Sequence, residues 1–260
     1  MSQGIVIDRR FRGPPNSVNG GYACGVVAEG IDGVATATLR LPPPLDTPLT
    51  LLRDGEKNRL MSGETLVGEA TTDSLDIEVP DAPVLETAIE ASRGFAGFEA
   101  HPFPGCYVCG PDRDPGDGLR IFPGPVEGSK VVAAPWTPGQ TLAGENGLVD
   151  RRHVWAALDC PSYFGLAGAP RALLGRLTAG IDRLPEIGEP LVAIGWATGV
   201  DGRKHFGGSA VADAGGTVFA RAAAIWIAVD SRGDRVFSRG GDPPGTPRSG
   251  QGSHDRSESA

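Results

Sequence analysis

One carboxylate that directly follows an apolar helical segment is the side chain best suited to do chemistry in this sequence. Asp159 comes after Val-Trp-Ala-Ala-Leu at 154–158, so a helix through this segment would carry it into the interior. Burial of a carboxylate raises its pKa towards the range of a general base. Asp-Cys-Pro-Ser at 159–162 is also typical of a helix end followed by a turn, so a capping role stays open.

A glycine pair opens a second apolar segment, Asn19-Gly20-Gly21, in a helix expected over about 18–29. The first N–H groups of a helix have no partner inside it and carry the positive end of the helix dipole. A substrate carbonyl could approach Gly20 and Gly21 closely, with Asn19 as the N-cap or as a polar contact. The alternative is that the glycines only allow tight packing of the helix against a sheet.

Metal-ligating side chains occur together at His101, Cys106 and Cys109. A structural zinc site needs four Cys or His ligands, so the fourth would have to be Asp112, Asp114 or a distant group. The alternative is a tight loop in which both thiols pack as small apolar groups. On the sequence we predict no metal and no other cofactor, and we expect the cysteines to be reduced thiols.

Further polar residues near the two apolar helices could contact an anionic substrate. Arginine is well suited to bidentate phosphate contacts, although charged residues at helix ends are usually just solvated. Hydroxyl groups near Asp159 could hold a water molecule beside its carboxylate. The expected substrate contacts are Arg12, Tyr22, Arg151, Arg152 and Ser162, and Thr178 is expected to join Asp159 in catalysis.

The bulk properties limit the class of protein. The 260 residues carry a net charge of −8, which argues against general affinity for nucleic acid or an anionic membrane. Neither an N-terminal signal nor an apolar run of about 20 residues is visible, so we expect a cytoplasmic protein with no membrane partner. Apolar residues at 40% are ordinary for a globular chain.

Most of the chain has the pattern of short strands and turns. A helix over 83–93 is expected to link two halves, and another over 149–160 to carry Asp159. The expected strands lie at about 4–11, 33–41, 48–61, 64–73, 118–123, 130–136, 174–183, 190–200, 205–213 and 217–229.

A weak internal repeat relates these halves. Thr36–Leu49 can be laid on Thr178–Leu191, and each copy has the pattern of a strand, a turn bounded by prolines, and a strand. An apolar helix precedes each copy and two strands follow it. We therefore expect an N-terminal repeat with a linking helix at 1–95, a Gly/Pro-rich connecting loop at 96–117, a C-terminal repeat at 118–230 and a disordered tail at 231–260.

This order of elements resembles the hotdog superfamily, and in particular the double-hotdog acyl-CoA thioesterases. The likeness is carried by Asn19-Gly20-Gly21, by Ala156-Ala157-Leu158-Asp159 and by Ile181-Asp182. It implies an α+β fold of two tandem hotdogs, each an antiparallel sheet curled around one central helix. It also implies hydrolysis of an acyl thioester such as an acyl-CoA, with water activated by Asp159 and the carbonyl polarised at Gly20-Gly21. Such chains could pair further as a homodimer.

Two departures from that family leave the activity open. The helix acid of the thioesterases works with a Thr before the Ile-Asp pair and a Gln on the last strand. Here Gly180 precedes Ile181, and 219–226 contains no Gln. A non-catalytic acyl-CoA-binding hotdog protein is therefore the alternative. A hydratase is disfavoured, because no His has an Asp five residues upstream.

Overall fold

The computed structural model describes residues 1–55, 57–166, 168 and 170–229. The predicted disordered tail, 231–260, lies outside the described residues. The predicted division at 95 and 118 stays a prediction. None of the described helices is long and apolar enough to cross a membrane.

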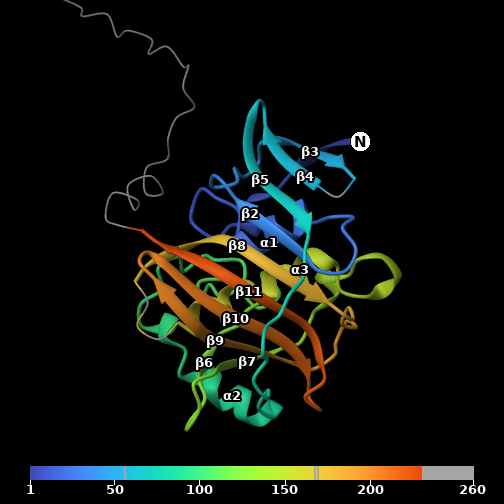
Figure 1. Ribbon diagram of the computed structural model, residues 1–260. Coiled ribbons are helices and arrows are strands. Elements are labelled where there is room, and N and C mark those ends of the chain that lie inside the picture. The colour runs from blue at the N-terminus through green and yellow to red at the C-terminus, as the bar shows by residue number, and fades with distance from the viewer. Residues whose placement is uncertain (56, 167, 169, 230–260) are drawn as a thin grey trace, which may run out of the picture.

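A single antiparallel sheet of eleven described strands forms the framework, in the order β1-β3-β4-β5-β2-β8-β11-β10-β9-β7-β6. Figure 1 shows the strands of the first half in blue and cyan beside β8 in yellow, followed by β11, β10 and β9 in orange. The strands are β1 (Ser2–Val6), β2 (Ala35–Leu39), β3 (Pro48–Asp54), β4 (Lys57–Ser62), β5 (Thr65–Thr72), β6 (Gly124–Pro125), β7 (Val132–Trp136), β8 (Ala172–Ile181), β9 (Leu191–Asp201), β10 (Lys204–Asp213) and β11 (Val218–Ala228).

The strand order repeats, which supports the internal repeat. The first half has the strand order β1-β3-β4-β5-β2 and the second half has β7-β9-β10-β11-β8. In each half the first strand after the buried helix, β2 or β8, pairs with the last strand of that half, β5 or β11. β2 and β8 pair antiparallel at the junction, where Thr36 lies opposite Thr178. These two threonines are the residues that the repeat superposes. The predicted α+β class, with antiparallel sheets, is confirmed.

The helices are few and mostly buried. They are α1 (Gly20–Val27), α2 (Leu85–Arg93), α3 (Arg151–Ala157) and α4 (Asp159–Phe164), with 3-10 turns at Arg9–Phe11, Ala96–Phe98, Gln140–Leu142 and Glu145–Gly147. α1 is buried from Gly21 to Val27 and packs against α3. α2 covers the opposite face, where Ala88 and Ala91 join a separate apolar cluster. The curled sheet therefore encloses α1, α3 and α4, and α2 closes the outside.

Four expectations about the elements were wrong. The strand expected over 4–11 ends at Val6, and Arg9–Phe11 forms a 3-10 turn. The segment 48–61 is a hairpin rather than one strand, because the chain turns at Gly55 with a φ of 61°. The segment 118–123 is not a strand. The helix expected over 149–160 divides at Leu158, and α4 starts anew at Asp159. Pro161 accounts for the division, because proline lacks the N–H that a continuous helix would need there and is tolerated in a first turn.

A buried histidine lies where α1 and α3 cross. The His153 ring lies 5.6 Å from the ring centroid of Tyr22 and 6.0 Å from that of Phe11, and its Nδ1 is 3.1 Å from the Tyr107 hydroxyl. Burial lowers the pKa of His153 from 6.5 to about 4. The folded protein therefore holds this ring neutral near pH 7.

That neutral histidine predicts a stability loss in mild acid. Unfolding lets His153 take up a proton below its ordinary pKa of about 6.5, so stability should fall as the pH drops from there towards 4, by up to about 1.4 kcal/mol per pH unit. Denaturant titrations of wild type and His153→Gln across this range measure the effect, and their difference removes the contribution of the carboxylates. Parallel pH profiles of the two proteins would contradict the prediction.

Candidate active site

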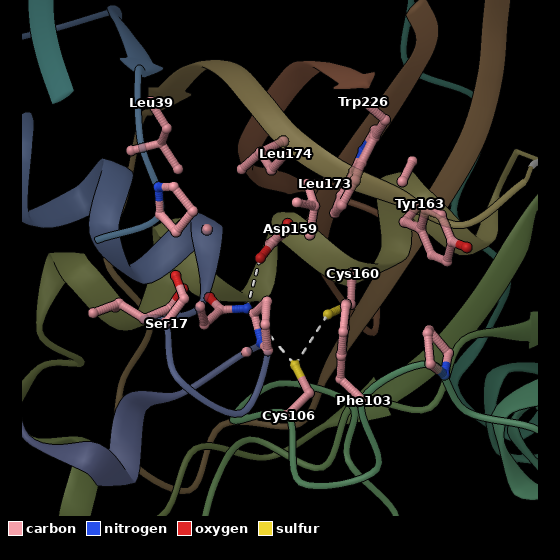
Figure 2. A pocket seen from close by; sticks show the side chains of 18 of the residues that line it. Ser17, Leu39, Phe103, Cys106, Asp159, Cys160, Tyr163, Leu173, Leu174 and Trp226 are labelled. Carbon is pink, nitrogen blue, oxygen red and sulfur yellow. Dashed lines mark hydrogen bonds between the residues drawn. The ribbon is translucent and has the colours of Figure 1, made fainter. Parts of the chain in front are cut away.

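A cavity of about 250 Å³ lies between the start of α1, the start of β8, the end of β11 and the loop 101–109. Figure 2 shows Asp159 inside it, with Leu173 and Leu174 on one side and Cys106 on the other. Most of its wall is apolar. The lining side chains include Val18, Leu39, Pro43, Phe103, Tyr163, Phe164, Leu173, Leu174, Trp226 and Ile227. Such a space suits an apolar group that enters towards one carboxylate.

Asp159 is held by the start of α1. Its Oδ2 accepts hydrogen bonds from Asn19 Nδ2 at 2.6 Å and from the Gly21 N–H at 2.9 Å. Its Oδ1 is buried without a hydrogen-bond partner among the described residues. One carboxylate oxygen therefore fixes the side chain, and the other is a buried acceptor without a partner among the described residues, on a residue that lines the cavity. The capping alternative is not what the carboxylate does here, since it bonds to another helix.

The same environment changes the acidity of Asp159. Burial raises its pKa from 3.8 to about 7, the Gly21 N–H lowers it, Cys106 raises it, and Asn19 lowers it. Desolvation is the largest of these effects because the side chain is only 2% exposed. A carboxyl group of this kind can accept and return a proton near neutral pH.

The residues of the glycine motif lie together but divide their roles. Asn19 Oδ1 accepts from the Tyr22 N–H at 2.9 Å, so Asn19 caps α1 while its amide holds Asp159. The Gly21 N–H is already bonded to Asp159, so this group is not available to a substrate carbonyl. Gly20 lines the cavity, and its N–H, as the first of the helix, has no acceptor within α1.

Gly21 also allows the tight helix packing that was the alternative explanation for the glycine pair. A Cβ at this position would lie 2.6 Å from both Asp159 Cβ and the Trp155 carbonyl oxygen. Glycine is therefore needed here for the close approach of α1 to α3 and α4. The motif serves both packing and polar contact, at neighbouring residues.

Ser162 lies behind Asp159 rather than in the cavity. Its hydroxyl donates to the Asp159 carbonyl oxygen at 2.7 Å and accepts from Trp226 Nε1 at 2.9 Å. These bonds tie α4 to β11, whose Trp226 forms part of the cavity wall. Ser162 thus positions the backbone of the site.

Thr178 is not among the described residues that line the cavity. Its hydroxyl lies 2.6 Å from that of Thr36, which also bonds to Asp73 at the β2–β8 junction. We therefore expect Thr178→Val to change the rate of the thioester hydrolysis that the resemblance implies by less than threefold, and to cost about 0.5–1.5 kcal/mol of stability. Rates and chemical denaturation of the purified variant test this. A large loss of turnover in a stably folded variant would instead indicate that Thr178 takes part in catalysis.

The four remaining predicted substrate contacts lie elsewhere among the described residues. Arg12 donates to the Gly105 carbonyl at 3.2 Å, and Arg151 to the Gly33 carbonyl at 3.2 Å. Arg152 is paired with Asp150 at 2.6 Å. Tyr22 stacks on Phe11 with ring centroids 4.1 Å apart. None of the four contributes to the cavity wall.

The cavity brings in residues that sequence reasoning did not select. Arg40 lines it with a side chain 52% exposed and is paired with Glu69. Cys160 meets Cys106 and Cys109 there, with His101 beside them. The sequence indicates only Cys106 and Cys109 as a pair. Cys160 is distant in sequence and comes next to them only in the folded protein.

The comparisons place this architecture in a known fold class. The chain has the double-hotdog fold, as the resemblance implied. The acyl-CoA thioesterase II TesB2 from Mycobacterium marinum superposes with a TM-score of 0.56 at 12% identity, over 89% of this chain and 94% of that one. The tesB protein of Mycobacterium avium subsp. paratuberculosis gives 0.57 at 12% identity, over 88% and 93%. A hot dog protein of unknown function from Alicyclobacillus acidocaldarius gives 0.54, also at 12%, over 88% and 93%. The sequence matches no family model and no curated protein.

Proposed function

We propose that this protein hydrolyses an acyl thioester, such as an acyl-CoA, with Asp159 as the general base. The observation that carries the proposal is the Asp159 Oδ1 atom, which is buried, has no partner among the described residues and belongs to a residue that lines an apolar cavity. A buried polar atom without a partner is costly, so a functional site is a reasonable explanation for its presence.

The proposed reaction uses two groups of the site, the Asp159 carboxylate and the Gly20 N–H. Asp159 accepts a proton from a water molecule as the water oxygen bonds to the thioester carbonyl carbon. The Gly20 N–H donates to the carbonyl oxygen as negative charge develops on it. The carbon–sulfur bond then breaks, and the proton held by Asp159 returns to the leaving thiolate. The products are a carboxylic acid and a free thiol.

The apolar lining of the cavity favours the acyl group as the part of the substrate that binds there. Leu39, Leu173, Leu174 and Trp226 offer contacts to a hydrocarbon chain and few to a polar one. The fold shared with proteins described as acyl-CoA thioesterase II supports the same substrate class, by analogy only. Of the arginines, Arg40 has the best position at the cavity to meet a CoA phosphate.

The test is thiol release from acyl-CoA substrates of increasing chain length, with the full chain and with an Asp159→Asn variant. Each added methylene that enters the cavity contributes up to about 0.8 kcal/mol, so kcat/KM should rise up to about fourfold per methylene and then level off. No turnover with any acyl-CoA would contradict hydrolysis. Tight acyl-CoA binding without turnover would support instead the non-catalytic binder.

A further inference from the structure

Three of the four cysteines converge at one edge of the cavity. The sulfur atoms of Cys106, Cys109 and Cys160 all lie within 4.8 Å of one another, and all three residues are buried. Cys106 and Cys160 are 3.8 Å apart, and Cys109 and Cys160 are 2.9 Å apart. The fourth thiol, Cys24, is buried in α1 and is not part of this group.

The spacing of these sulfurs is close to that of a tetrahedral thiolate site, except between Cys109 and Cys160. With zinc–sulfur bonds of about 2.3 Å, two sulfurs at the corners of a regular tetrahedron lie about 3.8 Å apart. The Cys106–Cys160 distance equals this edge, and Cys109 and Cys160 would have to separate by about 1 Å to admit the ion. Cys-x-x-Cys at 106–109 has the ligand spacing of zinc sites.

Hydrogen-bond donors surround the sulfurs in the way that stabilises thiolates. Asn19 Nδ2 lies 3.8 Å from the Cys106 sulfur, and His101 Nε2 lies 3.3 Å from the Cys109 sulfur. A Cβ at Gly110 would lie 2.5 Å from the Cys106 nitrogen and oxygen, so this tight turn requires glycine after Cys109. Such donors orient thiolate ligands and reduce their charge.

His101 belongs to this surrounding shell rather than to the ligands. Its Nδ1 accepts from the Phe103 N–H at 2.9 Å, so the proton of the neutral ring is on Nε2. Nε2 lies 3.3 Å from the Cys109 sulfur and therefore donates to it. The three sulfurs supply three corners of the tetrahedron. They also line the cavity, from which a water can supply the fourth.

We propose that Cys106, Cys109 and Cys160 bind one zinc ion. Three buried thiolates in tetrahedral arrangement select zinc over magnesium, calcium or manganese, which prefer oxygen ligands. The ion would fasten the loop 101–110 to α4, directly beside Asp159. With three protein ligands the ion would keep one position open to the cavity, unlike a closed structural zinc site. The proposal does not depend on what the cavity binds.

The first experiment measures the metal content of the full-length protein from zinc-supplemented medium after desalting into metal-free buffer. We expect about one zinc per chain, released when a mercurial reagent blocks the thiols. Refolding with cobalt should give intense visible bands and thiolate-to-cobalt charge-transfer bands of a tetrahedral site. A wild-type protein without zinc would overturn the proposal. So would a mass two hydrogens lower under denaturing conditions, which would indicate a Cys109–Cys160 disulfide.

Variants with matched controls locate the site. We expect the zinc content to fall at least about tenfold below that of wild type in each of three variants, Cys106→Ser, Cys109→Ser and Cys160→Ser. Cys24→Ala removes a buried cysteine outside the group and should keep the full content. His101→Gln changes a hydrogen-bond donor to Cys109 and should weaken zinc binding less than loss of a thiolate does. Circular dichroism verifies that each variant folds, and the wild-type cobalt spectrum decides the matter if a serine variant does not. Equal loss of zinc in Cys24→Ala would overturn the assignment of the ligands.

Discussion

Replacing Asp159 by asparagine should lower thioester turnover by about 10²–10⁴-fold while the protein stays folded. The asparagine oxygen can occupy the position of Oδ2 and accept from Asn19 and Gly21, which keeps α1 and α4 in place. Its NH₂ group would then replace Oδ1, and an amide cannot take a proton from water. The loss should therefore appear in kcat, as measured by initial rates of thiol release at saturating acyl-CoA.

A second aspartate supplies the control for this variant. Asp182 has a side chain 60% exposed and pairs with Arg221 on the neighbouring strand. Asp182→Asn removes the same charge outside the cavity and should leave turnover within about twofold of wild type. Thermal melting of both variants separates loss of chemistry from loss of structure. Full turnover in a folded Asp159→Asn protein would exclude the general base proposed here.

The sequence predicts the central part of the site because local patterns position it. An apolar run before Asp159 forces the carboxylate inwards, and the asparagine and two glycines at 19–21 open a helix that has no polar face. Strand alternation and the repeat of Thr36 at Thr178 predict the sheet and its two halves. These signals depend only on neighbours along the chain, and folding preserves them.

The surroundings of the carboxylate depend on tertiary contacts and are not visible in the sequence. Cys160 joins Cys106 only because α4 packs against the connecting loop. Charged residues at helix ends give no sign of their partners, so Arg152 was expected at a phosphate but pairs with Asp150 two residues away. Arg40 was not selected, although it lines the cavity, because nothing local distinguishes it from the other arginines.

Gly21→Ala should destabilise the protein by about 1–3 kcal/mol and lower turnover as well. The added methyl group would lie 2.6 Å from the Trp155 carbonyl oxygen and from Asp159 Cβ, and a backbone carbonyl cannot rotate away. α1 must then move from α3 and α4, which lengthens the bond between the Gly21 N–H and Asp159 Oδ2. The higher helix propensity of alanine, about 1 kcal/mol, offsets only part of this cost. Urea denaturation and acyl-CoA turnover of the purified variant measure the two effects.

Variants at two other glycines distinguish the effect of packing on stability from the role of the first N–H of α1 in turnover. Gly139→Ala adds a methyl group with nothing within 4 Å and should change stability by less than about 0.5 kcal/mol. At Gly20 the methyl group would lie 2.9 Å from both Cδ2 and Cβ of Leu174. Cδ2 can rotate away, but Cβ is fixed to the backbone of β8, so α1 and β8 must separate slightly. Gly20→Ala should therefore cost less stability than Gly21→Ala, because the atoms nearest the methyl group belong to a side chain, but it should lose turnover, because the methyl group narrows the approach to the N–H that we propose for the carbonyl. Turnover that survives in Gly20→Ala while stability falls would mean that this glycine, like Gly21, is required for packing, and the carbonyl would then need another donor.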